Sequence, residues 1–417
     1  MLEAGPHRPD VSGAVFALVA AGGTAGHILP ALAVAEALVE RGHQTSSIHF
    51  VGSRRGLDSA LVPQAGFGLT TLPGRGVPRG HKPADLARAA AAIGSLGAAT
   101  LAAMALVVRL RPRVVLSAGG YASVPCSIAA ALLGVPVVLV NVDSVPGAAS
   151  RVVASIAKVS AVAFKDTNLP RAVLTGAPLR SSIARVAESA RVETTRKASK
   201  LEARVALGLP LDIPVLLAFG GSLGAGRINR AIAEMVSSFW DVSLPLAVWH
   251  VVGGRDWPGW TAALGHVRSG IFYRAVEYED RMSMAYIAAD LAVCRAGAMT
   301  IAELAAFGLP ALLVPLPGAP GDHQNHNARA LVSAGAAELL EDTQCTGRRL
   351  AEEVSSLAGD SARLGAMGAA GQSLARLGAA EHIAGLLEHF ASPARSLRNK
   401  GPGSSEVRVV PGGDEPR

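Results

Sequence analysis

At 417 residues, half of them hydrophobic, the chain exceeds what one hydrophobic core usually organises, so two domains of similar size are expected. Only 4% of the residues are aromatic, which disfavours a base-stacking surface and a nucleic-acid partner, whereas the net charge of +7 predicts a phosphorylated substrate or an acidic membrane surface. Cys126, Cys294 and Cys345 are widely spaced, so neither a disulfide framework nor a zinc site is expected.

The first predicted domain covers residues 12–180. Residues 1–13 contain acids and prolines without an apolar segment, which is not typical of a secretion signal, so a cytoplasmic protein is expected. Apolar, β-branched runs then alternate with segments of helical period, which predicts parallel strands joined by helices, a doubly wound α/β domain. The helix after the first strand is expected to hold Pro30 in its first turn and to end before Gly42. The expected strands cover residues 15–20, 48–51, 114–117, 135–140 and 161–164.

The second predicted domain covers residues 211–378. Residues 181–210 are charged and poor in strand formers, which predicts an interdomain linker running into a helix. After the second domain, residues 379–391 are expected to form a C-terminal helix and residues 392–417 a disordered tail. The expected strands of this domain cover residues 215–219, 247–252, 291–294 and 311–315.

A glycine-rich loop occurs once in each predicted domain. FALVAAGGTAGH and PVLLAFGGSLGA superimpose when Gly22 is placed on Gly220, so a strand, a glycine loop and a helix start are repeated. Glycine lets the backbone approach a ligand, and a helix start offers unpaired N–H groups to an anion. Each loop could therefore hold a diphosphate. A tight turn without a ligand is the alternative, and two matched copies weigh against it.

Two common nucleotide-binding classes are disfavoured by these loops. GGTAGH is not the GxGxxG pattern, and the second strand is followed by Ser53 and Arg54 where a nicotinamide-binding domain would have an acid for the ribose. Neither loop is followed by the Gly-Lys-Ser/Thr sequence of a P-loop. The predicted anion is therefore bound without a P-loop lysine.

Motifs spread over residues 15–390 resemble those of the MurG family, the UDP-GlcNAc transferases of peptidoglycan synthesis. The motifs are GGTAGH, Arg-Gly at 75–76, SAGGYAS at 117–123, TGAPLR, GGSLGA, and CRAGAMTIAELAAFGLPALLVP followed by DHQNHNA. The resemblance implies the GT-B fold, two Rossmann-like doubly wound domains facing a cleft. It also implies inverting transfer of GlcNAc from UDP-GlcNAc to the C4 hydroxyl of MurNAc in undecaprenyl-linked lipid I, giving lipid II at the cytoplasmic face of the cell membrane.

The resemblance places the donor site mainly in the second domain. Glu303 would accept hydrogen bonds from the ribose hydroxyls, and Gln324 with Asn325 would contact the GlcNAc hydroxyls. A glycine loop and an arginine at the domain junction would meet the diphosphate. The donor residues so implied are Thr24, Gly26, Arg180, Ser222, Gly224, Glu303, Gln324 and Asn325.

The acceptor side is assigned to the first domain, with His27 as the catalytic residue. Its counterpart in the second glycine loop is Ala225, so equal loops carry unequal side chains. In the family this histidine is a candidate for deprotonating the attacking hydroxyl or for orienting the acceptor diphosphate, and imidazole suits proton transfer near neutrality. The alternative is a histidine that only donates to a phosphate. The other acceptor-side residues implied are Gly23, Gly119, Gly120, Tyr121 and Asp143.

Two segments depart from the family pattern, and no cofactor or metal is expected. Residues 140–143 read Val-Asn-Val-Asp where the family has HEQN, and Leu223 stands where the family has glutamine. The first departure keeps open a related GT-B enzyme that glycosylates a soluble acceptor. A nucleotide-sugar-binding protein without catalysis is a further alternative, against which the retained His27, Glu303 and Gln324 argue. No DxD-type carboxylate pair is present to hold a metal ion.

Residues 89–108 carry no charge and are rich in alanine. The segment is long enough to span a bilayer, but it lies between strands of one predicted sheet, so a helix or helix pair covering that sheet is expected instead. Seven lysines and arginines lie between residues 75 and 113 against one acid, a pattern that favours peripheral binding to an anionic membrane. A packed helix with a solvated charged rim is the alternative.

Overall fold

The computed structural model of the chain describes residues 14–53, 57–72, 83–221 and 224–392, with only the backbone helix described for 83–94. The N-terminal lobe is built on a parallel seven-stranded sheet of order β3-β2-β1-β4-β5-β6-β7. Its strands are β1 (Ala17–Ala20), β2 (Ile48–Ser53), β3 (Gly68–Leu72), β4 (Val114–Ser117), β5 (Val137–Asn141), β6 (Val159–Val162) and β7 (Ala172–Leu174).

The C-terminal lobe is built on a parallel six-stranded sheet of order β10-β9-β8-β11-β12-β13. Both sheets run outward in two directions from their first strand, as in Rossmann-like domains, so the predicted fold class is confirmed. The strands of this lobe are β8 (Val215–Phe219), β9 (Leu246–Val251), β10 (Ile271–Val276), β11 (Leu291–Cys294), β12 (Ala311–Leu313) and β13 (Ala337–Leu339).

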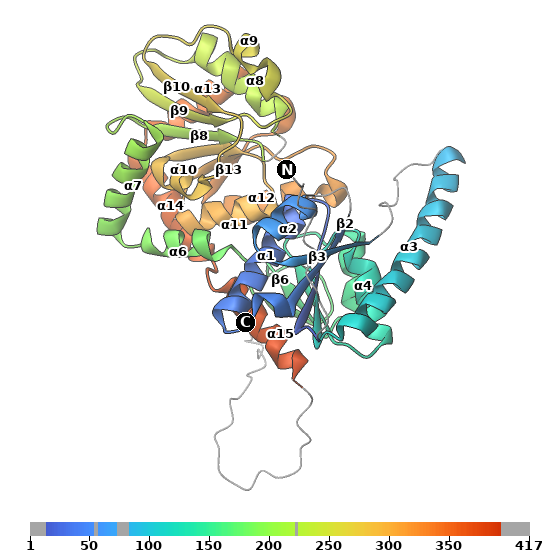
Figure 1. The fold of residues 1–417 in the computed structure, drawn as a ribbon. Helices are drawn as coiled ribbons and strands as arrows, with labels where there is room; N and C mark the ends of the chain where they lie inside the picture. Colours follow the sequence, from blue (N-terminus) through green and yellow to red (C-terminus); the bar gives the residue numbers. More distant parts are fainter. Residues whose placement is uncertain (1–13, 54–56, 73–82, 222–223, 393–417) are drawn as a thin grey trace, which may run out of the picture.

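Helices cover both sheets, and the lobes lie one beside the other (Figure 1). Those of the N-terminal lobe are α1 (Ala25–Glu40), α2 (Asp58–Gln64), α3 (Pro83–Leu110), α4 (Ser123–Leu132) and α5 (Ala148–Ile156). The later helices are α6 (Ser181–Ser189), α7 (Glu193–Leu207), α8 (Gly226–Glu234), α9 (Trp260–Leu264), α10 (Met282–Ala288), α11 (Ala298–Phe307), α12 (His323–Ser333), α13 (Gly347–Ala358), α14 (Ser361–Leu374) and α15 (Ala379–Ala391). Short 3₁₀ turns occur at Thr45–Ser47, Trp257–Gly259, Pro320–Asp322 and Asp342–Gln344, and a π turn at Met235–Phe239.

The first helix differs in one detail from its prediction. Pro30 is the sixth residue of α1 rather than part of its first turn, because the helix begins at Ala25 directly after the glycine loop. Its missing N–H leaves the carbonyl of Gly26 without the usual helical donor. The predicted stop is confirmed, since Gly42 has a φ of +101° just beyond the end of α1.

Residues 181–210, expected as a linker running into a helix, form two helices, α6 and α7. Their buried side chains, among them Ala187, Ala203 and Leu207, belong to the core under the second sheet. This segment is therefore packed on the C-terminal lobe. Of the C-terminal tail expected from residue 392 onward, residues 393–417 lie outside the described part of the chain.

The segment 89–108 lies within one continuous helix, α3, whose first half projects beyond the body of the N-terminal lobe (Figure 1). Its second half packs on the lobe through Ala103, Leu106 and Leu110. Among the helices that the structure describes, none is long and apolar enough to cross a membrane.

The last helix, α15, crosses back to the first lobe and lies along α1 (Figure 1). Ile383, Ala384 and Leu387 are fully buried in the same core as α1. At the surface, Glu388 accepts hydrogen bonds from the guanidinium of Arg41 and pairs with His43. The chain thus crosses between the lobes twice, once before α6 and once before α15.

Candidate functional site

The order of the strands predicts where each lobe binds its ligand. In a doubly wound sheet the helices leave from opposite faces at the strand pair where the order reverses, and this opens a crevice at the carboxyl ends of those strands. The reversal lies between β1 and β4 in the first lobe and between β8 and β11 in the second. The loops at these four ends hold the predicted motifs GGTAGH, SAGGYAS, GGSLGA and RAGAMT. The fold therefore gathers these four motifs at two crevices.

In the N-terminal crevice the loops after β1 and β4 are in close contact. A Cβ atom at Gly120 would lie 2.0 Å from the carbonyl oxygen of Gly22, and one at Gly119 would lie 2.6 Å from Nδ1 of His27. Both Gly119 and Gly120 also have positive φ. Only glycine fits here, and the His27 ring lies directly on the backbone of the second loop. Three of the predicted acceptor-side positions, His27, Gly119 and Gly120, are thus brought together.

Asp58 supports the first glycine loop from beneath and was not predicted. Its carboxylate is fully buried and accepts hydrogen bonds from the backbone N–H of Gly23 (2.9 Å) and of Ser53 (2.6 Å). The space for it exists because position 52 is glycine, where a Cβ would lie 2.5 Å from Oδ2 of Asp58. The N–H group of Gly23, a predicted acceptor contact, is therefore already used inside the protein.

The charge on His27 is set by its burial and by groups from both lobes. Burial lowers the pKa of His27 from its ordinary value of 6.5, while the negative charges of Asp143 and Asp58 and a hydrogen bond to the backbone of Ala118 act in the opposite direction. His323, at the first position of α12 in the other lobe, lowers it further. His27 is therefore mainly a neutral imidazole at pH 7 and faces the C-terminal lobe.

Asp143, the last of the altered positions 140–143, contacts the opposite lobe. Its Oδ1 accepts a hydrogen bond of 3.0 Å from Nδ2 of Asn327, and Oδ1 of Asn327 accepts one of 2.9 Å from the backbone N–H of Ser144. Asn327 is fully buried and also donates to the carbonyl of Ala296, in the RAGAMT loop after β11. These bonds show that the carboxyl edges of the two sheets face each other.

The other predicted residues of the first lobe take different positions. Thr24 and Gly26 are exposed at the start of α1, where Thr24 makes no capping hydrogen bond with its side chain. The side chain of Tyr121 reaches α3, where its hydroxyl donates a hydrogen bond to the carbonyl of Ser95 (3.3 Å). The loop after β4 is thereby tied to the helix expected to face the membrane. Arg75 and Gly76 lie outside the described residues.

In the C-terminal lobe, Glu303 on α11 is held by Tyr286 on α10. The tyrosine hydroxyl donates a hydrogen bond of 2.7 Å to Oε2 of Glu303. Burial raises the pKa of Glu303 to about 7, and the bond from Tyr286 acts in the opposite direction. Burial also raises the pKa of Tyr286, which keeps its hydroxyl protonated as the donor. Tyr286 is a second residue that the sequence reasoning did not single out.

Gln324 joins the loops that follow β11 and β12. Its Oε1 accepts hydrogen bonds from the backbone N–H of Ala296 (3.2 Å) and of Leu316 (2.9 Å). Both bonds are made by the side-chain oxygen of Gln324, and neither involves its amide nitrogen. Asn325 instead makes a local bond, from Nδ2 to Oδ1 of Asp322 (2.7 Å).

The parts expected to meet the diphosphate are only partly described. Gly224 has a φ of +80°, and a Cβ there would lie 2.2 Å from the carbonyl oxygen of Val252, so the loop packs closely on the backbone that directly follows β9. Ser222 and Leu223 lie outside the described residues. Arg180 does not extend toward this loop as a free side chain, because its Nε and Nη2 donate to Oε1 of Glu36 on α1 (2.9 and 2.6 Å).

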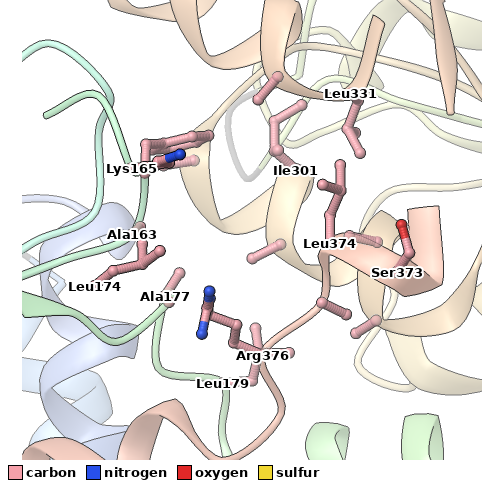
Figure 2. A pocket seen from close by; sticks show the side chains of 18 of the residues that line it. Ala163, Lys165, Leu174, Ala177, Leu179, Ile301, Leu331, Ser373, Leu374 and Arg376 are labelled. Carbon is pink, nitrogen blue, oxygen red and sulfur yellow. The ribbon is translucent and has the colours of Figure 1, made fainter. Parts of the chain in front are cut away.

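A cavity of about 520 Å³ lies between the lobes, beside the two segments where the chain crosses from one lobe to the other (Figure 2). Its walls are mostly small and aliphatic side chains, and Lys165 and Arg376 extend toward its open space. None of the predicted site residues that the structure describes lines this cavity. In the described part of the chain, no cluster of three or more His, Cys, Asp or Glu side chains is placed to hold a metal ion.

Both lobes match domains of one glycosyltransferase family. Residues 17–162 match the glycosyltransferase family 28 N-terminal domain, and residues 215–383 match the glycosyltransferase family 28 C-terminal domain. The first match covers β1 to β6, and the second covers β8 to β13.

Individual relatives match almost the whole chain. A UDP-N-acetylglucosamine–N-acetylmuramyl-(pentapeptide) pyrophosphoryl-undecaprenol N-acetylglucosamine transferase of Nocardioides sp. is 40% identical over 88% of this chain and 96% of its own length. The protein of that name from Desulforudis audaxviator is 37% identical over 90% of this chain and 98% of its own. The crystal structure of MurG from Acinetobacter baumannii superimposes with a TM-score of 0.69 at 25% identity, covering 90% of this chain and 99% of that one.

Proposed function

Because the chain belongs to the family of UDP-N-acetylglucosamine–N-acetylmuramyl-(pentapeptide) pyrophosphoryl-undecaprenol N-acetylglucosamine transferases, we infer that it transfers GlcNAc from UDP-GlcNAc to undecaprenyl-linked lipid I, giving lipid II. The observation that carries this conclusion is the similarity over about nine-tenths of the chain, which includes the loops at both crevices. The reaction joins the C4 hydroxyl of MurNAc to C1 of GlcNAc and releases UDP.

We propose that the C-terminal crevice binds the donor. Glu303 offers a carboxylate whose second oxygen is not used by Tyr286, which suits two neighbouring ribose hydroxyls. Gln324 is fixed through its oxygen beside Ala296, so its amide nitrogen is oriented to donate to a sugar hydroxyl. The loop holding Ser222 and Gly224 precedes α8, whose first N–H groups would face the diphosphate. Arg180 would join them only after leaving Glu36.

We propose that His27 takes the proton from the attacking hydroxyl. The oxygen of the C4 hydroxyl forms a bond to C1 of GlcNAc, the bond from C1 to the diphosphate oxygen breaks, and its electron pair leaves with UDP, which inverts C1. A neutral imidazole is needed for this step, and burial favours that form of His27. Asp143 and Asp58 are negative charges that favour the imidazolium as it forms.

We propose that the lobe meets an anionic membrane through α3, α4 and α5. Leu101 and Val108 on α3 are 69% and 59% exposed, and Leu132 at the end of α4 is 67% exposed. Arg109 is also on α3, and Arg151 is on α5 next to Val152, which is 49% exposed. Exposed apolar side chains beside cations suit binding at the lipid headgroup level.

The transfer can be tested directly with purified full-length protein. Incubation with UDP-[¹⁴C]GlcNAc and a lipid I analogue should give a labelled disaccharide lipid. A soluble acceptor is the second candidate, favoured by Asn141 and Asp143 in place of the family's HEQN positions. The same assay with soluble alcohols in place of the lipid would identify it. Labelled product from a soluble acceptor alone would overturn the lipid assignment.

A further inference from the structure

The contact between Asp143 and Asn327 is unusual because it joins the lobes at the predicted reaction centre. Asp143 follows β5 in the first lobe, and Asn327 lies on α12 in the second. Asn327 is fully buried, and its side chain makes three hydrogen bonds, with Asp143, with Ser144 and with Ala296. Both of its polar atoms are therefore satisfied across the interface, as burial requires.

The same contact continues to residues on both sides of the reaction. On the donor side, the peptide of Ala296 accepts from Asn327 through its carbonyl, and the N–H of Ala296 donates to Gln324, the proposed sugar contact. On the acceptor side, Asp143 and Asp58 both raise the pKa of His27, and Asp143 has the larger effect. Hydrogen bonds thus run from Gln324 through Ala296 and Asn327 to Asp143, whose negative charge acts on His27.

We propose that Asn327 positions the carboxylate of Asp143 toward His27, so that docking of the two lobes sets the charge environment of the acceptor-side histidine. Asp143 acts here as a positioning residue, and Asn327 is its partner from the donor lobe. The proposal rests on the proposed function for its consequence in catalysis. The influence of Asn327, in the second lobe, on the charge at His27, in the first lobe, does not depend on that function.

The charged groups around His27 come from three elements. Asp143 follows β5, Asp58 begins α2, and His323 begins α12. Asp58 is fixed within its own lobe by two backbone N–H groups, so movement of the lobes leaves it in place. Asp143 is the acid whose carboxylate is held from the opposite lobe. Separation of the lobes would release that carboxylate and change the balance of charge at His27.

Two substitutions distinguish the effect of the negative charge of Asp143 from the effect of its hydrogen bond with Asn327. Asp143→Asn removes the negative charge but keeps an oxygen that can accept from Asn327. Asn327→Ala keeps the negative charge of Asp143 but removes the amide that holds the carboxylate. Asn327→Ser, whose side chain is too short to reach Asp143, replaces it if the alanine variant does not fold. Asp166→Asn, an exposed aspartate facing the interlobe space, is the matched control.

The direct readout is the titration of His27 by NMR in the protein without substrates. We expect Asp143→Asn and Asn327→Ala, or Asn327→Ser in its place, to lower the pKa of His27, and Asp166→Asn to leave it unchanged. With UDP-GlcNAc and the lipid I analogue, kcat should fall about tenfold in both variants, and the pH profile of kcat should shift toward acid. Thermal unfolding confirms that each variant is folded.

A titration of His27 that stays unchanged when Asn327 is replaced would overturn the proposal, even if activity falls, because a purely structural contact would lower activity without moving the titration. Absence of GlcNAc transfer by the unchanged protein would instead contradict the proposed function. The two failures are therefore distinguishable, since the titration is measured without substrates.

Discussion

At the scale of single residues, His27 is the most direct test of the mechanism. Its ring lies on the backbone of Gly119, where a smaller side chain leaves the loops in place. His27→Ala should therefore lower kcat by about 10²- to 10⁴-fold, the usual contribution of a general base, with little change in KM for UDP-GlcNAc. Steady-state kinetics with the lipid I analogue measures both. His266→Ala, an exposed histidine of the other lobe, is the control. An unchanged kcat for His27→Ala would exclude His27 as the base.

The raised pKa of Glu303 predicts that donor binding depends on pH. With its pKa raised to about 7, the carboxylate is increasingly protonated as the pH falls below 7, and it then loses the capacity to accept from two ribose hydroxyls. Affinity for UDP should therefore decrease from pH 8 to pH 6, as measured by calorimetry. Glu303→Gln should bind about tenfold more weakly and show little of this pH dependence.

Tyr286→Phe provides the matched variant for that experiment. The hydrogen bond from Tyr286 lowers the pKa of Glu303, so its removal should move the midpoint of the pH dependence toward higher pH. A midpoint that does not move would show that Tyr286 has no influence on the carboxylate in solution.

The predicted residues differ in how they depend on tertiary structure. Gly119, Gly120 and His27 lie in local motifs that follow strands, so the sequence places them correctly in one crevice. Asp58 and Tyr286 have no local signal, because each acts on a residue of another element that only the folded sheet brings near. Their roles therefore could not be read from spacing along the chain.

At the scale of elements, central strands were predictable and edge strands were not. β4, β8 and β11 have the bounds predicted from their apolar runs, since each is buried by helices on both faces. The four unpredicted strands, β3, β7, β10 and β13, are the outermost strands of the two sheets. An edge strand is partly exposed and needs fewer apolar residues, so its sequence resembles that of a loop.

The exposed face of α3 gives a prediction about membrane binding. Leu101→Glu combined with Val108→Glu places two acids on its exposed apolar stripe and should abolish cosedimentation with vesicles containing anionic lipid, while leaving transfer to a soluble lipid I analogue intact. The matched control is Leu201→Glu with Val205→Glu on α7, where the same residue types are 50% and 67% exposed on the other lobe. Equal vesicle binding by the two double variants would contradict a membrane-facing α3.

At the scale of the whole molecule, the lobes are joined by contacts of two kinds. The polar contact of Asn327 with Asp143 and Ser144 lies between the carboxyl edges of the two sheets, at the proposed reaction side, and can be broken when the lobes separate. The second crossing instead ends in α15, whose apolar side chains are part of the first lobe's core. Helix α15 therefore contributes to the core of the first lobe, although it follows the second lobe in the sequence.

This arrangement predicts that a substitution in α15 destabilises the N-terminal lobe. Leu387→Ala removes a fully buried side chain from the core shared with α1 and should lower the free energy of unfolding by about 2 to 5 kcal/mol. Leu201→Ala, at a half-exposed position on α7, should change it by about 0.5 kcal/mol or less. Denaturant unfolding measures the change in the free energy of unfolding. Hydrogen exchange of the backbone amides of β1 and β4 shows whether the N-terminal lobe is the part that is destabilised. If exchange rises in β8 and β11 instead, α15 does not stabilise the first lobe, and the second crossing would be only a connection between lobes.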